Sequence, residues 1–281
     1  MTRPTFGLLA VSLLWGTTFV AVKSGLQDAS PLLFVGLRFG IGALASLALL
    51  PHRERLASTL RAAVPLGLVL AAGYATQTLG LQTSSPARSA FVTGANVAIV
   101  PLWGMALLGM RARPFSLLGL GVVLPGLWLL TSPGGNAWGV GDSWTLACAV
   151  FFALHVVLVN RWGPQHEASA LLVTQLAVTA AVCLGAAALF EAPRISMTPR
   201  LALALAVTGI LATTGTTWLQ LRYQPRVEPT RAALIYATEP VFAAAFSLWI
   251  FGEALPALGW LGGALIVAGT LVSEVGARRR S

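Results

Sequence analysis

Residues 168–190 read ASALLVTQLAVTAAVCLGAAALF, which is 23 positions without a charged side chain. A helix rises about 1.5 Å per residue, so a run of about 20 apolar residues crosses the hydrocarbon core of a bilayer. Nine further apolar runs of similar length lie at residues 5–22, 31–50, 62–81, 89–110, 114–130, 143–160, 201–221, 232–252 and 257–275. The sequence therefore predicts an all-α polytopic membrane protein with ten transmembrane helices.

The composition excludes several other classes of protein. Of the 281 residues, 56% are hydrophobic and 10% are charged, which rules out a soluble domain with a water-facing surface. The apolar runs are continuous rather than alternating, which excludes an outer-membrane barrel. The net charge of +9 is dispersed over short loops without interleaved aromatics, so no nucleic-acid partner is expected. Cys148 and Cys183 both fall inside apolar runs, and we predict no disulfide framework, metal site or cofactor.

The charged residues predict the orientation of the chain. Ten crossings place both termini on one side, and that side would carry Arg3, Arg53, Arg55, Arg61, Arg111, Arg113, Arg161, Arg222, Arg226, Arg231, Arg278, Arg279 and Arg280. The opposite side would carry only Lys23, Arg88, Arg194 and Arg200. Lys and Arg are enriched in cytoplasmic loops of membrane proteins. Both termini are therefore expected in the cytoplasm, and the loop at 131–142 outside.

The sequence also contains a weak internal duplication. A shift of 143 positions aligns Gln77 with Gln220, Arg88 with Arg231, Gly119 with Gly262 and Gly126 with Gly269, and a shift of 137 aligns Lys23 with Asn160. These shifts predict two five-helix repeats, at residues 1–130 and 131–281. Because five is odd, the second repeat enters the membrane from the opposite side. Inverted repeats of this kind are typical of secondary transporters, which bind substrate near the midplane between the halves.

Polar side chains recur at helical spacing inside the apolar runs. In hydrocarbon they either form hydrogen bonds between helices or line a water-filled cavity. For a single threonine, a hydrogen bond between helices is the simpler explanation. Because amides, an imidazole, a phenol and a carboxylate recur at middle depth in both halves, we favour a cavity for the set. The candidate substrate-binding residues are Trp15, Thr18, Tyr74, Gln77, Thr78, Asn96, Trp103, His155, Gln175, Thr217, Trp218, Tyr236 and Glu239.

Two ionisable residues inside the runs need a physical explanation. Glu239 must be protonated, paired or hydrated, and both a structural or gating role and a substrate or proton role stay open. Arg38 is flanked by Gly36 and Gly40 in a GxxxG spacing that allows close helix contact, so we expect a structural role, with substrate binding as the alternative. The glycine-rich fifth and tenth runs are expected to form a scaffold outside the cavity. Whether the protein is a monomer or a homodimer stays open.

Several motifs resemble those of a known family. They are Leu14-Trp15-Gly16-Thr17-Thr18-Phe19 with Lys23, then Leu37-Arg38-Phe39, then Glu239-Pro240-Val241 with Gly252-Glu253. This pattern resembles the EamA type of the drug/metabolite transporter superfamily, although Gly109-Met110 stands where that family usually has glycine and glutamate. The resemblance implies a central cavity formed by helices 1, 3, 4, 6, 8 and 9. The aromatic lining further resembles that of bacterial inner-membrane exporters of aromatic amino acids.

Together these observations predict an inner-membrane secondary transporter that exports small amphipathic metabolites, chiefly amino acids including aromatic ones, by alternating access. The sequence contains no GxxxxGK[ST] loop for ATP. An intramembrane enzyme is a weak alternative because HExxH and GxSxG are missing too. A passive channel is a second alternative, although polar rings would suit a continuous pore better than aromatic patches. The expected partners are a small-molecule substrate and the lipid bilayer.

Overall fold

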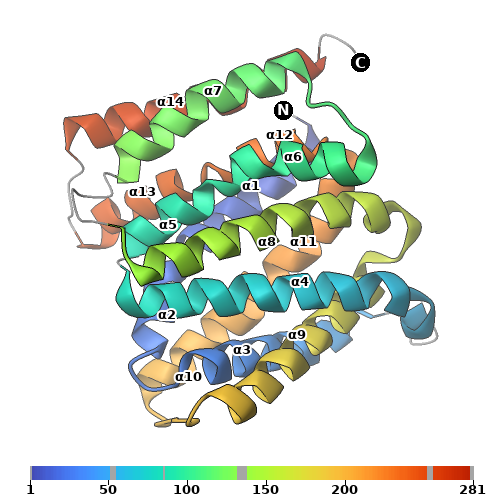
Figure 1. Cartoon of the computed structure of the whole chain (residues 1–281), viewed down its shortest axis with the longest axis vertical. Helices are drawn as coiled ribbons and strands as arrows, with labels where there is room; N and C mark the ends of the chain where they lie inside the picture. Colours follow the sequence, from blue (N-terminus) through green and yellow to red (C-terminus); the bar gives the residue numbers. More distant parts are fainter. Residues whose placement is uncertain (1, 51–54, 85, 132–137, 252–255, 279–281) are drawn as a thin grey trace.

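The computed structural model describes residues 2–50, 55–84, 86–131, 138–251 and 256–278. Figure 1 shows these residues as a stack of helices that run side by side. The α-helices are α1 (Arg3–Gly16), α2 (Thr18–Gly25), α3 (Pro31–Ser46), α4 (Arg55–Thr83), α5 (Pro86–Gly94), α6 (Asn96–Leu108), α7 (Pro114–Thr131), α8 (Val140–Trp162), α9 (Ala168–Phe190), α10 (Pro199–Ala206), α11 (Thr216–Tyr223), α12 (Pro229–Tyr236), α13 (Glu239–Phe251) and α14 (Ala257–Arg278). Short 3-10 helices are η1 (Leu47–Leu49), η2 (Gly163–Gln165) and η4 (Gln224–Arg226), and η3 (Val207–Gly215) is a π-helix.

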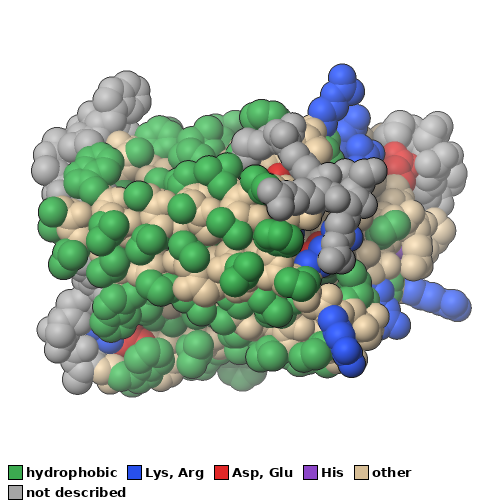
Figure 2. All heavy atoms as spheres, turned by 90° about the horizontal axis from the view of Figure 1, so that it is seen from above, with side chains coloured by type: hydrophobic (Ala, Val, Ile, Leu, Met, Phe, Trp, Pro, Cys, Tyr) green, Lys and Arg blue, Asp and Glu red, His purple; other side chains and the backbone are tan. Residues whose placement is uncertain are grey.

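The all-α polytopic membrane fold is confirmed. Eight helical stretches are long and apolar enough to cross a bilayer, and Pro114–Leu130 is a shorter apolar helix. The pair α12 and α13 covers the remaining predicted run. Apolar side chains cover the flank of the bundle, and the Lys and Arg side chains visible on that face gather mainly toward one end (Figure 2). Large exposed apolar residues such as Leu118, Trp128 and Trp260 are expected where the surrounding solvent is lipid.

Both ends of the chain lie toward the same end of the bundle (Figure 1). Thr5, near the start of α1, donates a hydrogen bond from Oγ1 to Glu274 Oε2 on the last turns of α14 at 3.0 Å. Arg231, at the start of α12, forms an ion pair with the same Glu274 carboxylate. An even number of crossings is required to bring these segments together.

Four of the predicted membrane-spanning runs are interrupted within their length, and a fifth, at 31–50, ends in the 3-10 helix η1. The run at 5–22 changes direction at Thr17, between α1 and α2, and the run at 89–110 is broken at Ala95, between α5 and α6. The ninth run is broken at Ala237 and Thr238, and the eighth contains η3. The Thr238 hydroxyl donates to the Ile235 carbonyl at 2.7 Å, and Pro240 has no N–H for the Tyr236 carbonyl. Local side-chain bonds and proline therefore replace the regular helical ladder at the ninth run.

Helices α7 and α14 form the predicted scaffold, and glycines bring their backbones into contact. A Cβ atom added to Gly119 would lie 2.5 Å from the Gly269 carbonyl oxygen. A Cβ atom added to Gly126 would lie 2.8 Å from the Gly262 carbonyl oxygen. The 143-residue shift aligns Gly119 with Gly262 and Gly126 with Gly269, so the two contacts are equivalent under exchange of the halves. In contrast, the GxxxG pair on α3 is in close contact only through Gly36, because a Cβ on Gly40 would meet no atom within 4 Å.

A second pair of equivalent contacts lies at opposite ends of the bundle. Lys23, at the end of α2, donates from Nζ to the carbonyl oxygens of Leu81 and Ser84. Asn160, on the last turns of α8, donates from Nδ2 to the carbonyl oxygens of Gln224, at 3.3 Å, and Val227, at 2.7 Å. The 143-residue shift takes residues 81 and 84 to 224 and 227, and the 137-residue shift takes Lys23 to Asn160. Each half therefore has a side chain that donates to two carbonyl oxygens at equivalent positions, and the donor is a lysine in one half and an asparagine in the other.

Two ion pairs connect helix ends and a loop at the end of the bundle away from the termini. Arg200 binds Asp28 through two hydrogen bonds, from NH2 to Oδ1 at 2.7 Å and from Nε to Oδ2 at 2.8 Å. Arg88 likewise donates from Nε to Asp142 Oδ1 at 2.6 Å and from NH2 to Asp142 Oδ2 at 2.8 Å. Such two-point bonds between a guanidinium and a carboxylate are among the stronger ones in proteins.

We expect the Asp28–Arg200 pair to lose its stabilising effect in acid. Hydrogen bonds from Arg200 and then Thr198 lower the pKa of the Asp28 carboxyl from 3.8 to about 2. Stabilisation from a lowered pKa is complete above the unfolded-state value and is lost as the pH falls through the folded-state value. In detergent, the difference in melting temperature between wild type and Asp28→Asn should stay constant from neutral pH to about pH 4 and shrink toward pH 2. A difference that does not change with pH would contradict this assignment.

Candidate functional site

A cavity lies in the middle of the bundle, where the broken helices meet. It encloses about 900 Å³, its open mouth included, and is lined by residues of α1, α2, α3, α4, α5, α6, α8, α11, α12 and α13 with the break at Ala237. Most of the lining is apolar or aromatic, and a few polar groups converge on the space. The resemblance implied that the first, third, fourth, sixth, eighth and ninth crossings form the cavity. The second crossing, α3, contributes to the lining as well.

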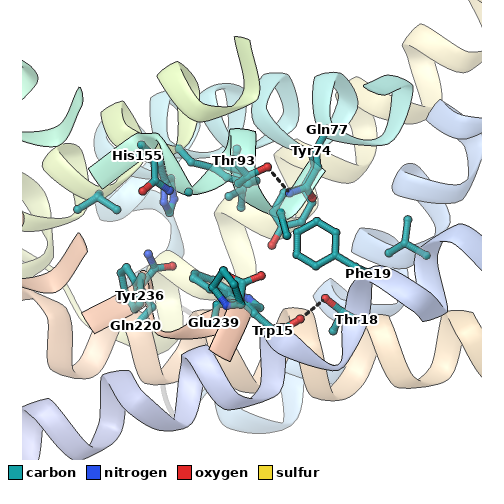
Figure 3. Close-up of a pocket in the computed structure, with 18 of the residues that line it drawn as sticks. Trp15, Thr18, Phe19, Tyr74, Gln77, Thr93, His155, Gln220, Tyr236 and Glu239 are labelled. Atoms are coloured by element: carbon teal, nitrogen blue, oxygen red, sulfur yellow. Dashed lines mark hydrogen bonds between the residues drawn. The ribbon is translucent and has the colours of Figure 1, made fainter. Parts of the chain in front are cut away.

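One wall carries Tyr74, Gln77, Thr93 and His155 (Figure 3). The His155 Nε2 atom lies 3.1 Å from Gln175 Oε1, and both side chains are almost fully buried. Gln77 Nε2 donates to Thr93 Oγ1 at 3.5 Å. These hydrogen bonds restrict the orientations of the imidazole and the amide, so the polar groups of this wall are held in place before any ligand binds.

The opposite wall carries Trp15, Gln220, Tyr236 and Glu239 (Figure 3). The Trp15 and Tyr236 rings lie with their centroids 5.2 Å apart, which is a favourable tilted aromatic contact. Tyr236 donates from its hydroxyl to Gln224 Oε1 at 3.1 Å, and Gln220 Nε2 donates to the same atom at 2.9 Å. Aromatic surface and fixed amides therefore lie side by side on this wall.

Glu239 and Arg38 are the charged members of the lining. Glu239 is the first residue of α13, directly after the break in the ninth crossing. Its carboxylate makes no hydrogen bond or ion pair with any residue in the described ranges. A helix N-terminus favours a negative charge, which partly offsets the cost of placing a carboxylate there. Arg38 lies on α3, and its Nε donates to Thr213 Oγ1 at 2.7 Å.

The structure brings most of the residues predicted from the sequence into this cavity. Those that line it are Trp15, Thr18, Tyr74, Gln77, Asn96, His155, Thr217, Tyr236 and Glu239. The others, Thr78, Trp103, Gln175 and Trp218, are outside the lining. Gln175 lies behind the wall and contacts His155, and Trp218 stacks against Arg222 with the guanidinium carbon 5.1 Å from the ring centroid. Trp103 packs against the apolar cluster that contains Val100 and Val156.

Other lining residues were not among the candidates. Thr93 lies three residues before Asn96, and Gln220 lies three residues after Thr217. Each therefore shares a helix face with a candidate residue, and this spacing was a sufficient signal. Phe152 aligns with Trp15 under the 137-residue shift, and this symmetry was the available signal. Phe19 needed the three-dimensional arrangement. Arg38, for which substrate binding was the alternative to a structural role, also lines the cavity.

The cavity offers no metal site within the described part of the chain. No group of three or more His, Cys, Asp or Glu residues there is close enough to hold an ion. Cys148 and Cys183 are buried free thiols. The glycine–glutamate motif at Gly252-Glu253 lies outside the described residues. The chemistry of the site is therefore that of amides, aromatic rings, one guanidinium, one imidazole and one carboxylate.

Comparisons with known proteins point to one family. The EamA-like transporter family matches the chain twice, at residues 3–132 and 139–274. The chain is 30% identical over 284 residues to the uncharacterized inner membrane transporter YedA of Escherichia coli strain K12, covering 97% of this chain and 91% of that protein. It is 26% identical over 266 residues to an uncharacterized transporter of Archaeoglobus fulgidus, covering 95% of this chain and 84% of that protein. The names of these relatives state no substrate.

A solved crystal structure has the same fold, with a TM-score of 0.79 and 23% sequence identity, over 99% of this chain and 98% of that chain. The two family matches together cover nearly all of the helices described above. The relatives are named as transporters, which agrees with a helical membrane protein that encloses a small-molecule cavity. This multi-pass membrane protein belongs to the EamA-like transporter family.

Proposed function

We propose that the protein is an inner-membrane secondary transporter that exports small amphipathic metabolites, chiefly amino acids including aromatic ones. The observation that carries the proposal is the mixed lining of the cavity. Trp15, Tyr74 and Tyr236 offer aromatic surface, while Arg38 and Glu239 offer opposite charges. An amphipathic molecule with an apolar side chain and charged groups matches this combination. The location between the two halves and next to broken helices is typical of transporter sites.

Alternating access is the mechanism that best suits the architecture. The breaks at Thr17, Ala95 and Ala237 lie beside the cavity, so the two parts of each crossing can tilt separately. The Lys23 and Asn160 contacts lie at opposite ends of the bundle. Breaking one of them while keeping the other would open the cavity to one side only. The distribution of Lys and Arg supports cytoplasmic termini, with the Asn160 contact then on the cytoplasmic side.

Counterflow in proteoliposomes tests this function. Vesicles loaded with unlabelled phenylalanine should take up labelled phenylalanine faster than empty vesicles, because a carrier that returns with bound substrate exchanges it across the membrane. Alanine, threonine and a sugar outside the vesicles should be compared as competitors. Uptake that does not depend on internal substrate would favour a passive channel. Absence of amino-acid uptake with folded, reconstituted protein would exclude the proposed substrate class.

A further inference from the structure

Arg38 carries a buried positive charge that the described protein does not neutralise. The residue is 3% exposed and lines the cavity from α3. Its guanidinium forms no ion pair with a carboxylate in the part of the chain that the structure describes. A buried ion without a counter-charge is costly, and such a group is retained where a ligand or a conformational change supplies the partner.

The surroundings of Arg38 fix its guanidinium in one orientation. The Nε atom donates to Thr213 Oγ1 at 2.7 Å, and the guanidinium carbon lies 4.7 Å from the centroid of the Tyr74 ring and 5.6 Å from that of Phe39. Thr213 is itself buried on η3. A guanidinium has five N–H groups, and besides the bond from Nε to Thr213 a side-chain hydrogen bond joins the guanidinium to Tyr74. The guanidinium is therefore held in place by Thr213 and Tyr74, and no carboxylate among the described residues pairs with it.

The chemistry of the missing partner follows from the fork of the guanidinium and from the charge of the lining. Two parallel N–H groups of arginine match the two oxygens of a carboxylate. Arg38 is the basic residue and Glu239 the acidic residue of the described lining, so the cavity offers one group for each pole of a zwitterion. This balance suits a molecule with one carboxylate and one ammonium group better than a phosphate, which would bring two negative charges.

We infer that Arg38 binds the carboxylate of the transported molecule, and that Thr213 and Tyr74 position its guanidinium for this contact. The inference rests on the proposed function, because it assigns one pole of the substrate in the same cavity. It makes Arg38 a specificity-determining residue: molecules that lack a carboxylate lose the contact, and molecules that lack an ammonium group keep it.

Three related probes test the assignment by titration calorimetry of the full-length protein in detergent. Phenylalanine has both charged groups, 3-phenylpropionate has only the carboxylate, and 2-phenylethylamine has only the ammonium. In Arg38→Gln, the affinities for phenylalanine and 3-phenylpropionate should each fall by about tenfold or more, while the affinity for 2-phenylethylamine should stay unchanged. Arg38→Lys keeps the charge without the fork and should fall between wild type and Arg38→Gln.

Two further variants separate binding from folding. Thr213→Val removes the bond to Nε and should weaken both carboxylates by a smaller factor than Arg38→Gln. Arg222→Gln removes an exposed arginine outside the cavity and should change none of the three affinities. If Arg38→Gln does not yield folded protein, the Arg38→Lys and Thr213→Val variants carry the same comparison. An equal loss for the amine and the carboxylates, or no loss for 3-phenylpropionate, would overturn the inference.

Failure of the proposed function gives a different result. If the wild type binds 3-phenylpropionate with Arg38 dependence and does not bind phenylalanine, the carboxylate assignment stands and amino-acid transport is excluded. If the wild type binds phenylalanine and Arg38→Gln binds it equally well, amino-acid recognition stands and the role of Arg38 is excluded. If the wild type binds neither carboxylate, both are excluded.

Discussion

Replacing Gly126 by leucine should abolish the recovery of folded protein from membranes. A Cβ atom at this position would lie 2.8 Å from the Gly262 carbonyl oxygen and 2.9 Å from the Ile266 amide nitrogen, so α7 and α14 must separate to admit a side chain. Overpacking of a close contact costs about 1–3 kcal/mol or more, and here the obstacle is backbone that cannot change rotamer. Gly262→Leu, on the other side of the crossing, should have the same effect.

Gly121→Leu is the matched control in the same helix. Gly121 is exposed, and a Cβ atom there would meet nothing within 4 Å. Leucine has a higher helix propensity than glycine, so this variant should be recovered at the wild-type level or slightly above it. Size-exclusion chromatography of fluorescently tagged protein measures both outcomes. Normal recovery of Gly126→Leu would mean that the α7–α14 contact does not hold the halves together.

Replacing Glu239 by glutamine should slow transport by about tenfold or more while leaving the fold intact. The carboxylate lines the cavity at the start of α13 and has no partner among the described residues. The resting structure therefore does not rely on this charge, and the carboxylate is available to a substrate ammonium group, a proton or a cation in another state. Glutamine keeps the shape and removes the charge.

The measurement is the initial rate of counterflow as a function of pH, with melting temperature as the check on folding. Glu239→Gln should give a slower rate, a flatter pH profile and a melting temperature close to that of the wild type. Glu228→Gln is the control, because Glu228 contacts Ser116 near the end of the bundle, outside the cavity. A wild-type rate with an unchanged pH profile would show that neither charge nor proton at position 239 matters for transport.

Hydropathy alone predicted the number and position of the membrane-spanning runs, because the apolar core of a bilayer imposes a minimum length on every crossing. The interruptions of the first, fourth and eighth runs were not predicted. Thr17, Ala95 and Ala237 have nothing in their own chemistry that interrupts a helix. Only Pro240 gave a local signal, since proline removes a backbone donor in the ninth run. The other breaks depend on packing against neighbouring helices, which single-sequence patterns do not contain.

The candidate site was predicted best where polar residues repeat at helical spacing. Tyr74 with Gln77, and Thr217 with Gln220, follow that rule and lie in the lining. Trp103 was expected in the cavity from its depth and from its position on the same helix face as Thr93 and Asn96, but it packs against the apolar cluster that contains Val100. Spacing predicts the helix face on which a residue lies. How far the cavity extends along that face depends on the neighbouring helices, which the pattern of one helix does not contain.

The role of Arg38 could not be decided from the sequence. A lone cation with glycines at Gly36 and Gly40 matched a close helix contact, and the structure has that contact at Gly36 alone. What distinguishes a structural arginine from a ligand-binding one is whether a carboxylate of the protein neutralises its charge. That Arg38 contacts Thr213 and Tyr74 and no carboxylate of the described residues becomes visible only in the three-dimensional structure.

The crossing of α7 and α14 has the symmetry of a homodimer interface. Gly119 meets Gly269, and Gly126 meets Gly262, which is the reciprocal pairing of an isologous contact. Each half therefore carries the complete set of glycines that the contact requires. A separate five-helix chain of this kind could pair with a second copy of itself, provided that the two copies insert in opposite directions. Fusion into one chain supplies that arrangement permanently, and it frees each half to change its own residues, as Lys23 and Asn160 have done.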